Sequence, residues 1–265
     1  MVDLARWEAL TTEDARAAML SEENVERVRR VFDALTPDPA YTRFIVDRVR
    51  SGHLDLRLAM SWLANQIRPD LYLEVGVRRG FSSAVVAAVM PEVSIYGFDM
   101  WVKDYVGVEN PGPAFVRGEL ARAGFHGKAT FVNGNSHSTL PRFWGDKPYP
   151  PISRLLGRAV PAPPADFDLV LVDGDHSIEG AYRDLSDVIN HVRVGGAIVF
   201  DDIAPDLSEL NDADLRAVAR ELGPDPNGRG GLLGVWRAIQ QEHPNFRYFE
   251  FTEESPGVAF GVRMS

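Results

Sequence analysis

The sequence predicts an α/β fold in which helices cover both faces of a central, mostly parallel sheet. Short apolar runs rich in β-branched residues alternate along the chain with segments of helical periodicity, as in strands joined by helices. A glycine-rich turn follows the first of these runs, and acidic residues follow the later ones. The chain of 265 residues is long enough for one such domain with extensions.

The composition limits the classes of partner. The formal net charge of −10 argues against nucleic acid, because a phosphate backbone requires a basic surface. A small neutral or cationic substrate, or a metal ion, suits this charge better. The sequence contains no cysteine, which excludes disulfides and thiolate metal ligands. Residues 1–20 lack the apolar segment of a signal peptide, and no apolar run is long enough to cross a membrane, so we expect a cytoplasmic protein.

Residues 1–68 are predicted to form a helical extension that the fold itself does not require. Ser21 is placed to cap a helix that ends near Leu35, because acidic residues follow it and apolar residues recur at helical spacing. Two further helices are expected at about 41–49 and 55–66. The extension is a candidate lid, substrate wall or contact in a homo-oligomer.

The turn after the first strand gives the strongest signal for ligand binding. Residues 71–75 are typical of a strand, and the Ala/Val-rich segment after the turn is typical of a helix. Gly76 and Gly80 permit backbone angles and close approaches that other residues do not. The helix that begins near Ser82 presents free N–H groups to an anionic ligand. The spacing from Glu74 is E-x-G-x-x-x-G, whereas dinucleotide-binding proteins have G-x-G-x-x-G.

A second strand is expected at 93–98, and Asp99 follows it directly. An acidic residue at this place, about 20 residues after a glycine-rich turn, commonly binds the two hydroxyls of a ribose. The next side chains, Met100 and Trp101, could lie against an adenine ring, and Trp101 could equally belong to the core.

The middle of the chain gives weaker signals. A helix at about 113–123 precedes a third strand at 129–132, which closes in an Asn-Gly turn that includes Asn135 and Ser136. The proline-rich segment 144–165 is predicted to be an irregular insertion, because proline interrupts both helices and core strands. It is a candidate lining for the mouth of a substrate site.

The next two expected strands are each followed directly by ionisable residues: Asp173, Asp175 and His176 after 167–172, and Asp201 and Asp202 after 197–200. Because the carboxyl ends of parallel strands share one edge, we expect Asp173, Asp201 and Asp202 to converge beside the glycine-rich turn. Such carboxylates raise one another's pKa values, and a hard divalent cation, best Mg²⁺, relieves the repulsion. The alternative is that one of the paired acids caps the next turn while Asp173 faces a ribose or water.

The last third of the chain begins with a second predicted insertion, 203–231, which contains a helix near 212–222 and could cover the substrate. A helix at 232–242 is expected next. Residues 246–251 and 258–262 read as a hairpin around a Pro-Gly turn.

Together these motifs resemble those of the class I S-adenosylmethionine (SAM) methyltransferases. The segments 172–176 and 195–202 are similar to those of metal-dependent O-methyltransferases that act on small molecules, including the macrocin- and mycinamicin-type sugar O-methyltransferases of antibiotic pathways. The resemblance implies a Rossmann-like SAM-binding domain over residues 69–265, with a seven-stranded sheet whose last strand is antiparallel. It implies Mg²⁺, or another hard divalent cation, on Asp173, Asp201 and Asp202. It also implies a SAM site formed by Glu74, Gly76, Arg78, Gly80, Ser82, Asp99, Met100, Trp101, Asn135, Ser136 and Asp173.

The resemblance further implies transfer of the SAM methyl group to a hydroxyl of a secondary metabolite or its sugar, which leaves S-adenosylhomocysteine (SAH). The cation lowers the pKa of the hydroxyl, and His176 or Asp175 accepts its proton. Relatives differ in which of these positions provides the base, and this chain has both residues. Two alternatives are a nicotinamide-dependent oxidoreductase, which the missing third glycine disfavours, and a SAM-binding module without transfer activity.

Overall fold

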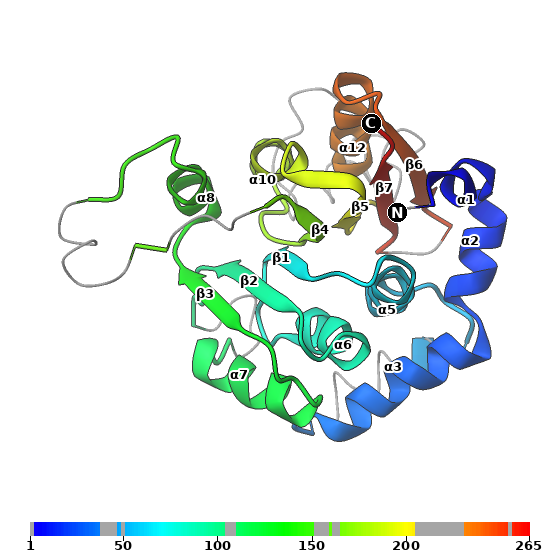
Figure 1. Ribbon diagram of the computed structural model, residues 1–265, viewed down its shortest axis with the longest axis horizontal. Helices are drawn as coiled ribbons and strands as arrows, with labels where there is room; N and C mark the ends of the chain where they lie inside the picture. Colours follow the sequence, from blue (N-terminus) through cyan, green and yellow to red (C-terminus); the bar gives the residue numbers. More distant parts are fainter. Residues whose placement is uncertain are drawn as a thin grey trace, which may run out of the picture.

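The protein is described here by a computed structural model that covers residues 3–37, 47–48, 51–103, 110–150, 159–160, 165–204, 231–253 and 256–265. Its strands are β1 (Leu71–Val75), β2 (Ser94–Asp99), β3 (Ala129–Asn133), β4 (Phe167–Val172), β5 (Val192–Asp201), β6 (Phe246–Phe251) and β7 (Val258–Arg263). They form one seven-stranded sheet in the order β3-β2-β1-β4-β5-β7-β6 (Figure 1). Strands β1 to β5 are parallel, and β7 lies antiparallel between β5 and β6. The predicted fold class is confirmed.

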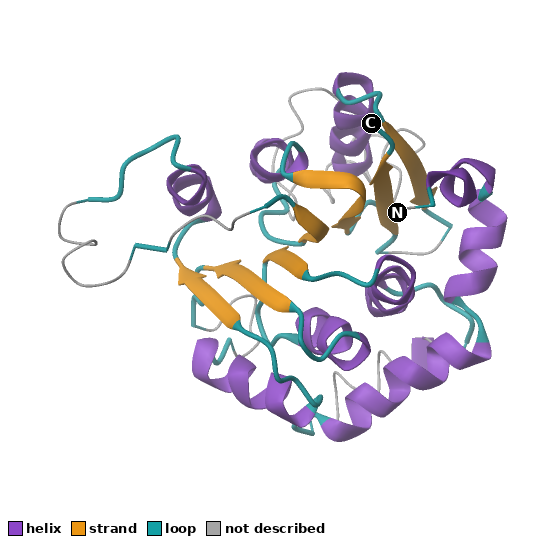
Figure 2. Cartoon of the chain, in the orientation of Figure 1, coloured by secondary structure: helices purple, strands orange, loops and turns teal. Residues whose placement is uncertain are grey.

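Helices cover both faces of the sheet (Figure 2). One layer contains α5 (Leu56–Ile67), α6 (Phe81–Val89) and α7 (Pro113–Arg122), and the other contains α8 (Ser136–Trp144), α10 (Ile178–Ile189) and α12 (Gly231–Glu242). Successive strand residues point to opposite faces, so Leu169 and Leu171 of β4 pack in the first layer while Val170 and Val172 pack in the second. This alternation explains why the strand is apolar throughout.

The N-terminal helices are α1 (Leu4–Ala9), α2 (Thr12–Met19) and α3 (Glu22–Ala34). Helices α2 and α3 pack on α5, α3 also packs on α6, and Trp7 of α1 packs edge-to-face on Trp62 of α5. Ser21 caps α3 as predicted, because its hydroxyl accepts a hydrogen bond from the Asn24 N–H at 3.4 Å. Asp55 caps α5 in the same way. The helix expected at 41–49 lies almost entirely outside the described residues.

A buried carboxylate joins this extension to α7. Glu119 is only 2% exposed, and it accepts hydrogen bonds from the N–H of Thr36 at 2.8 Å and from its hydroxyl at 2.5 Å. Thr36 follows α3, which runs along the edge of the molecule toward α7 (Figure 1). The apolar side chains of α3 belong to the same hydrophobic cluster as those of α5 and α6.

Two elements differ from the sequence-based prediction. Helix α8 was not predicted; Asn135 caps it, and it continues through Pro141 because Leu140 and Phe143 are buried against the sheet. Strand β5 begins at Val192 rather than at residue 197, since a register shift against β4 accommodates the glycines within it. The C-terminal helix and hairpin are confirmed. The helix expected at 212–222 lies outside the described residues.

Candidate functional site

A cavity of about 330 Å³ lies at the carboxyl ends of β1, β2 and β4, a volume at the lower end of the range for ligand sites. Among the predicted cofactor residues, those that line it are Gly76, Arg78, Asp99, Met100, Asn135, Ser136 and Asp173. Asp175 and His176 line it as well. The structure therefore brings most of the predicted site residues to one place.

Gly76 is required by the close approach of the β1 turn to the end of β4. Its φ is 89°, and a Cβ atom there would lie 1.8 Å from the carbonyl oxygen of Asp173. The N–H of Asp173 donates to the Val75 carbonyl at 2.8 Å, and the N–H of Gly76 donates to the Phe98 carbonyl at 2.9 Å. These bonds fix the ends of three strands relative to one another.

The carboxylate of Asp99 is oriented by the backbone. Its Oδ2 accepts a hydrogen bond from the Arg78 N–H at 2.7 Å, and its Oδ1 accepts one from the Trp101 N–H at 2.5 Å. Each carboxylate oxygen can accept further bonds, so Asp99 can still bind a pair of hydroxyls. Met100 and Val102, 51% and 45% exposed, provide apolar surface in the same cavity.

Three predicted cofactor residues lie behind the cavity wall. Glu74 is 1% exposed and accepts a hydrogen bond from the hydroxyl of Ser83; burial raises its pKa to about 8. Gly80 begins α6 with a φ of 79° where a side chain would collide with Val116. Ser82 is buried in the first turn of the same helix. They shape the turn without lining the cavity.

Trp101 is the fourth predicted cofactor residue that does not line the cavity. It is 8% exposed and packs edge-to-face on Phe131, with ring centroids 5.8 Å apart. Its Nε1 donates to the Arg78 carbonyl at 3.3 Å. The structure places Trp101 in the core, which is the second of the two roles that the sequence left open.

An acidic group lies beside the cavity. His176 Nε2 is 3.3 Å from Asp173 Oδ1, and His176 Nδ1 is 3.2 Å from Asp202 Oδ2. Ligand atoms of these three residues lie within 4.8 Å of one another, which makes them the candidate metal group among the described residues. Asp202 adopts a φ of 59°, so the chain turns sharply after β5. Carboxylate oxygens and an imidazole nitrogen are suitable ligands for a divalent cation, so this donor set fits one.

The electrostatics of this group follow from burial and proximity. The hydrogen bond with Asp173 raises the pKa of His176 to about 9, against the effect of burial. Burial, followed by the charge of Asp173, raises the pKa of Asp202. A cation placed among these side chains would be stabilised by the carboxylates.

Asp201 is not part of that group, although the sequence places it among the metal ligands. It ends β5 and is 7% exposed, and its Oδ1 has no hydrogen-bond partner among the described residues. Burial raises its pKa well above the usual range, and the charges of Asp173 and Asp202 raise it further. An unpartnered carboxylate oxygen so close to two acids is compatible with a bound cation.

Asp175 faces away from the acidic group. Its Oδ1 accepts a hydrogen bond from the Ser177 N–H at 2.9 Å, and its Oδ2 is 3.8 Å from His137 Nε2. Its carboxylate also packs so closely on Gly180 that a Cβ atom there would lie 2.0 Å away. Of the two candidate bases, His176 is therefore the one that contacts Asp173 and Asp202.

Some residues of the cavity carry no sequence signal. Asn110 lines it, and its buried Oδ1 has no hydrogen-bond partner in the described part of the chain. Val102 lines it from the loop after β2. Neither lies in a motif, and only the folded chain brings them there.

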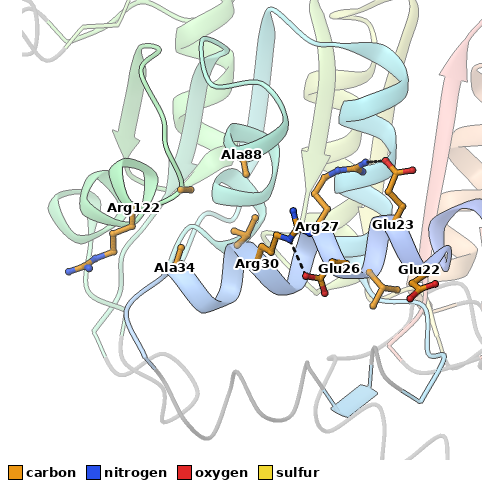
Figure 3. A pocket seen from close by; sticks show the side chains of 11 residues that line it. Glu22, Glu23, Glu26, Arg27, Arg30, Ala34, Ala88 and Arg122 are labelled. Atoms are coloured by element: carbon orange, nitrogen blue, oxygen red, sulfur yellow. Dashed lines mark hydrogen bonds and ion pairs between the residues drawn. The ribbon is translucent and has the colours of Figure 1, made fainter.

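A larger hollow, of about 930 Å³, lies on the outer surface between α3, α6 and α7 (Figure 3). Four of its charged side chains form pairs along α3: Arg27 with Glu23 at 2.7 Å and Arg30 with Glu26 at 3.0 Å. It contains none of the predicted site residues. It is a solvated groove between helices.

No helix in the described part of the chain is long and apolar enough to span a membrane.

Residues 73–203, which include the cavity and the acidic group, match a family model described as a methyltransferase domain. A comparison with curated proteins finds no match. The fold is similar to the SAM-bound O-methyltransferase TomG from Streptomyces achromogenes, involved in tomaymycin synthesis (TM-score 0.53, 18% identity, 87% of this chain and 92% of that chain). It is also similar to the SAH-bound methyltransferase PaMTH1 from Podospora anserina (TM-score 0.51, 18% identity, 95% and 88%).

A further similar structure is the O-methyltransferase from Bacillus cereus in complex with SAH (TM-score 0.50, 15% identity, 92% of each chain). At these identities the structures show a shared fold. The family match does not favour the oxidoreductase alternative. The family model covers residues 73–203, and the order of the strands is that of the Rossmann-like fold of these methyltransferases.

Proposed function

We propose that the protein is a SAM-dependent, Mg²⁺-assisted O-methyltransferase that acts on a hydroxyl of a small molecule, a secondary metabolite or its sugar. The observation that carries this proposal is that Asp99 and the acidic group lie at the same cavity. Asp99, Asp173 and His176 line one cavity, and Asp202 contacts His176 beside it. The SAM or SAH bound in the similar structures supports the cofactor.

In this proposal the cavity binds the adenosine part of SAM, which supplies a methyl group on a sulfonium. Asp99 accepts hydrogen bonds from the ribose hydroxyls, and the exposed side chain of Met100 contacts the adenine. Asn135 caps α8 through the His137 N–H at 2.9 Å, and the side chain of Ser136 hydrogen-bonds Asp184; both residues line the cavity where the adenine edge would lie. Glu74, Gly80, Ser82 and Trp101 support this surface from behind.

Asp173 and Asp202 would hold the divalent cation, with Asp201 as the third carboxylate. The cation would act as a Lewis acid toward the acceptor hydroxyl. His176 would accept the proton of that hydroxyl once a cation on Asp173 and Asp202 offsets the carboxylate charges that raise its pKa to about 9, because an imidazolium ring cannot act as a base. Asp175 is engaged by the Ser177 N–H. The main contribution of the protein is to hold the acceptor oxygen in line with the methyl group.

We further propose that residues 69–265 form the SAM-binding domain and that the helical extension 1–68, with the insertions at about 144–165 and 203–231, provides the acceptor side or a contact in a homo-oligomer. The negative formal charge of −10 favours a small-molecule acceptor over nucleic acid.

The first test is calorimetric titration of SAH into the protein, once in EDTA and once with Mg²⁺. Micromolar binding in both solutions supports the SAM site and assigns the cation to the acceptor side. Binding only with Mg²⁺ places the cation in contact with the cofactor. The absence of binding in both solutions would overturn the proposed function.

A further inference from the structure

Asp184 is a buried acid that the proposed chemistry does not use. It lies on α10, and its side chain is fully buried. Burial raises its pKa above the usual range, and Ser136 and His137 lower it. A buried carboxyl group needs polar partners, and those of Asp184 come from two segments that line the proposed cofactor site.

The first segment is the loop after β4. The N–H of Asp175 donates to Asp184 Oδ2 at 3.4 Å. A Cβ atom at Gly174 would lie 3.0 Å from the same oxygen and 2.9 Å from Val75 Cγ1, so the loop passes closely between Asp184 and β1. Gly174 and Asp175 both line the cavity on the opposite side of this contact.

The second segment is the start of α8. Asp184 Oδ1 lies 3.3 Å from His137 Nε2, which is also 3.3 Å from the carbonyl oxygen of Gly180 on α10. Nε2 donates to the Gly180 carbonyl, whereas its contact with Asp184 Oδ1 is electrostatic, because that oxygen has no hydrogen-bond partner among the described residues. His137 follows directly on Asn135 and Ser136, which line the cavity. The position of these residues therefore depends on how His137 is held.

We propose that Asp184 is a positioning residue for the cofactor site, which holds the start of α8 and the loop after β4 together from behind the cavity. The proposal rests on the proposed function, because the cavity is taken to bind SAM. Asp184 itself lines no part of the cavity. Its replacement should therefore weaken cofactor binding through the two segments and not through a lost contact.

The chain offers a matched control in Asp168, which is 7% exposed. Its Oδ2 accepts hydrogen bonds from the N–H groups of Asp70 and Leu71, at 2.8 and 2.7 Å, at the opposite end of the sheet. Asp168 also pairs with Arg193, and both Asp168→Asn and Asp184→Asn replace a buried carboxylate that accepts hydrogen bonding from the backbone. Only the second should affect the cofactor site.

The experiment measures SAH affinity by calorimetry for the wild-type protein, Asp184→Asn and Asp168→Asn, at a temperature where all three are folded. We expect the dissociation constant to rise by roughly 10-fold for Asp184→Asn, as for a lost buried polar partner, and to stay unchanged for Asp168→Asn. An unchanged constant for Asp184→Asn, or equal increases for both variants, would overturn the proposal.

Amide hydrogen exchange without ligand separates this proposal from the proposed function. Exchange at 134–137 and 173–176 should be faster in Asp184→Asn than in Asp168→Asn; equal exchange overturns the proposal even if wild-type protein binds no SAH. If Asp184→Asn does not fold, His137→Phe, whose ring has no nitrogen, removes the same contact from the side of α8. It should raise the dissociation constant similarly, and unchanged affinity would count against the proposal.

Discussion

Asp99 Oδ2 lies 2.7 Å from the backbone nitrogen of Arg78, so the residue that ends β2 is joined directly to the turn after β1. Arg78 adopts a φ of 50°, which is uncommon for a residue with a side chain. The bond therefore fixes the carboxylate and the unusual turn together.

Asp99→Asn should weaken SAH binding by roughly 10-fold or more, because an amide has one acceptor oxygen and places an NH₂ group against a backbone N–H. Calorimetric titration of SAH measures the effect. Asp33→Asn, at an exposed aspartate of α3, is the control and should bind SAH normally. Equal affinity in all three proteins would remove Asp99 from the cofactor site.

Asp202→Asn and Asp201→Asn should each lower Mg²⁺-dependent turnover by roughly 100-fold or more, while SAH affinity stays largely intact. The reason is that each replaces a carboxylate next to Asp173. Titration of Mn²⁺ followed by electron paramagnetic resonance measures metal binding without an acceptor. Asp166→Asn, at the opposite end of β4, is the control. Normal metal affinity and turnover in Asp201→Asn would restrict the carboxylate ligands of the metal to Asp173 and Asp202.

Glu74→Gln should change how stability depends on pH. The folded protein keeps Glu74 protonated up to a pKa of about 8, whereas the unfolded chain releases the proton near 4.5. The unfolded state binds fewer protons between these values, so this group's stabilising contribution is full below pH 4.5 and falls as pH rises toward 8.

Urea unfolding at several pH values in that window measures the effect. The free energy of unfolding of the wild type, relative to Glu74→Gln, should fall by at most about 1.4 kcal/mol per pH unit. Glu23→Gln, at an exposed glutamate of α3, should retain the wild-type slope. Parallel curves for wild type and Glu74→Gln would show that Glu74 is ionised when folded.

Gly76→Ala should destabilise the protein by about 3 kcal/mol or more, since the new Cβ atom would meet a backbone oxygen at a φ that disfavours alanine. Gly118→Ala is the matched control. Gly118 lies within α7 with open space around its Cβ position, so alanine should stabilise by about 0.5–1 kcal/mol. Thermal unfolding compares the two. Similar small effects would show that the turn can open without loss of packing.

The sequence predicts those features that depend on local pattern. The strand before Gly76, the acids at strand ends and the C-terminal hairpin follow from periodicity and turn residues, and the structure confirms them. The direction of the side chains just after β2 and β5 cannot be predicted from the sequence pattern. Trp101 has a φ of 42° and Asp202 a φ of 59°, so neither continues the alternation of its strand. The core position of Trp101 and the contact of Asp202 with His176 both follow from these turns.

Helix α8 shows that packing in the folded chain can override a local sequence signal. The prolines around it indicate a break, and yet the helix continues through Pro141 because burial of Leu140 and Phe143 outweighs one lost hydrogen bond. The role of Asp184 has no local signal either, because its partners are nine and 47 positions away. Such contacts depend on the packing of the helices and become visible only in the folded chain.

The bond between Glu119 and Thr36 bears on how the protein can be divided. A shortened chain that starts after residue 68 would leave the Glu119 carboxylate, 2% exposed in the intact protein, without its two donors from Thr36. The same deletion would uncover the apolar surfaces of α6 and α7. Residues 69–265 are therefore not expected to fold apart from the helical extension, and chimeric proteins should exchange α3 and α7 together.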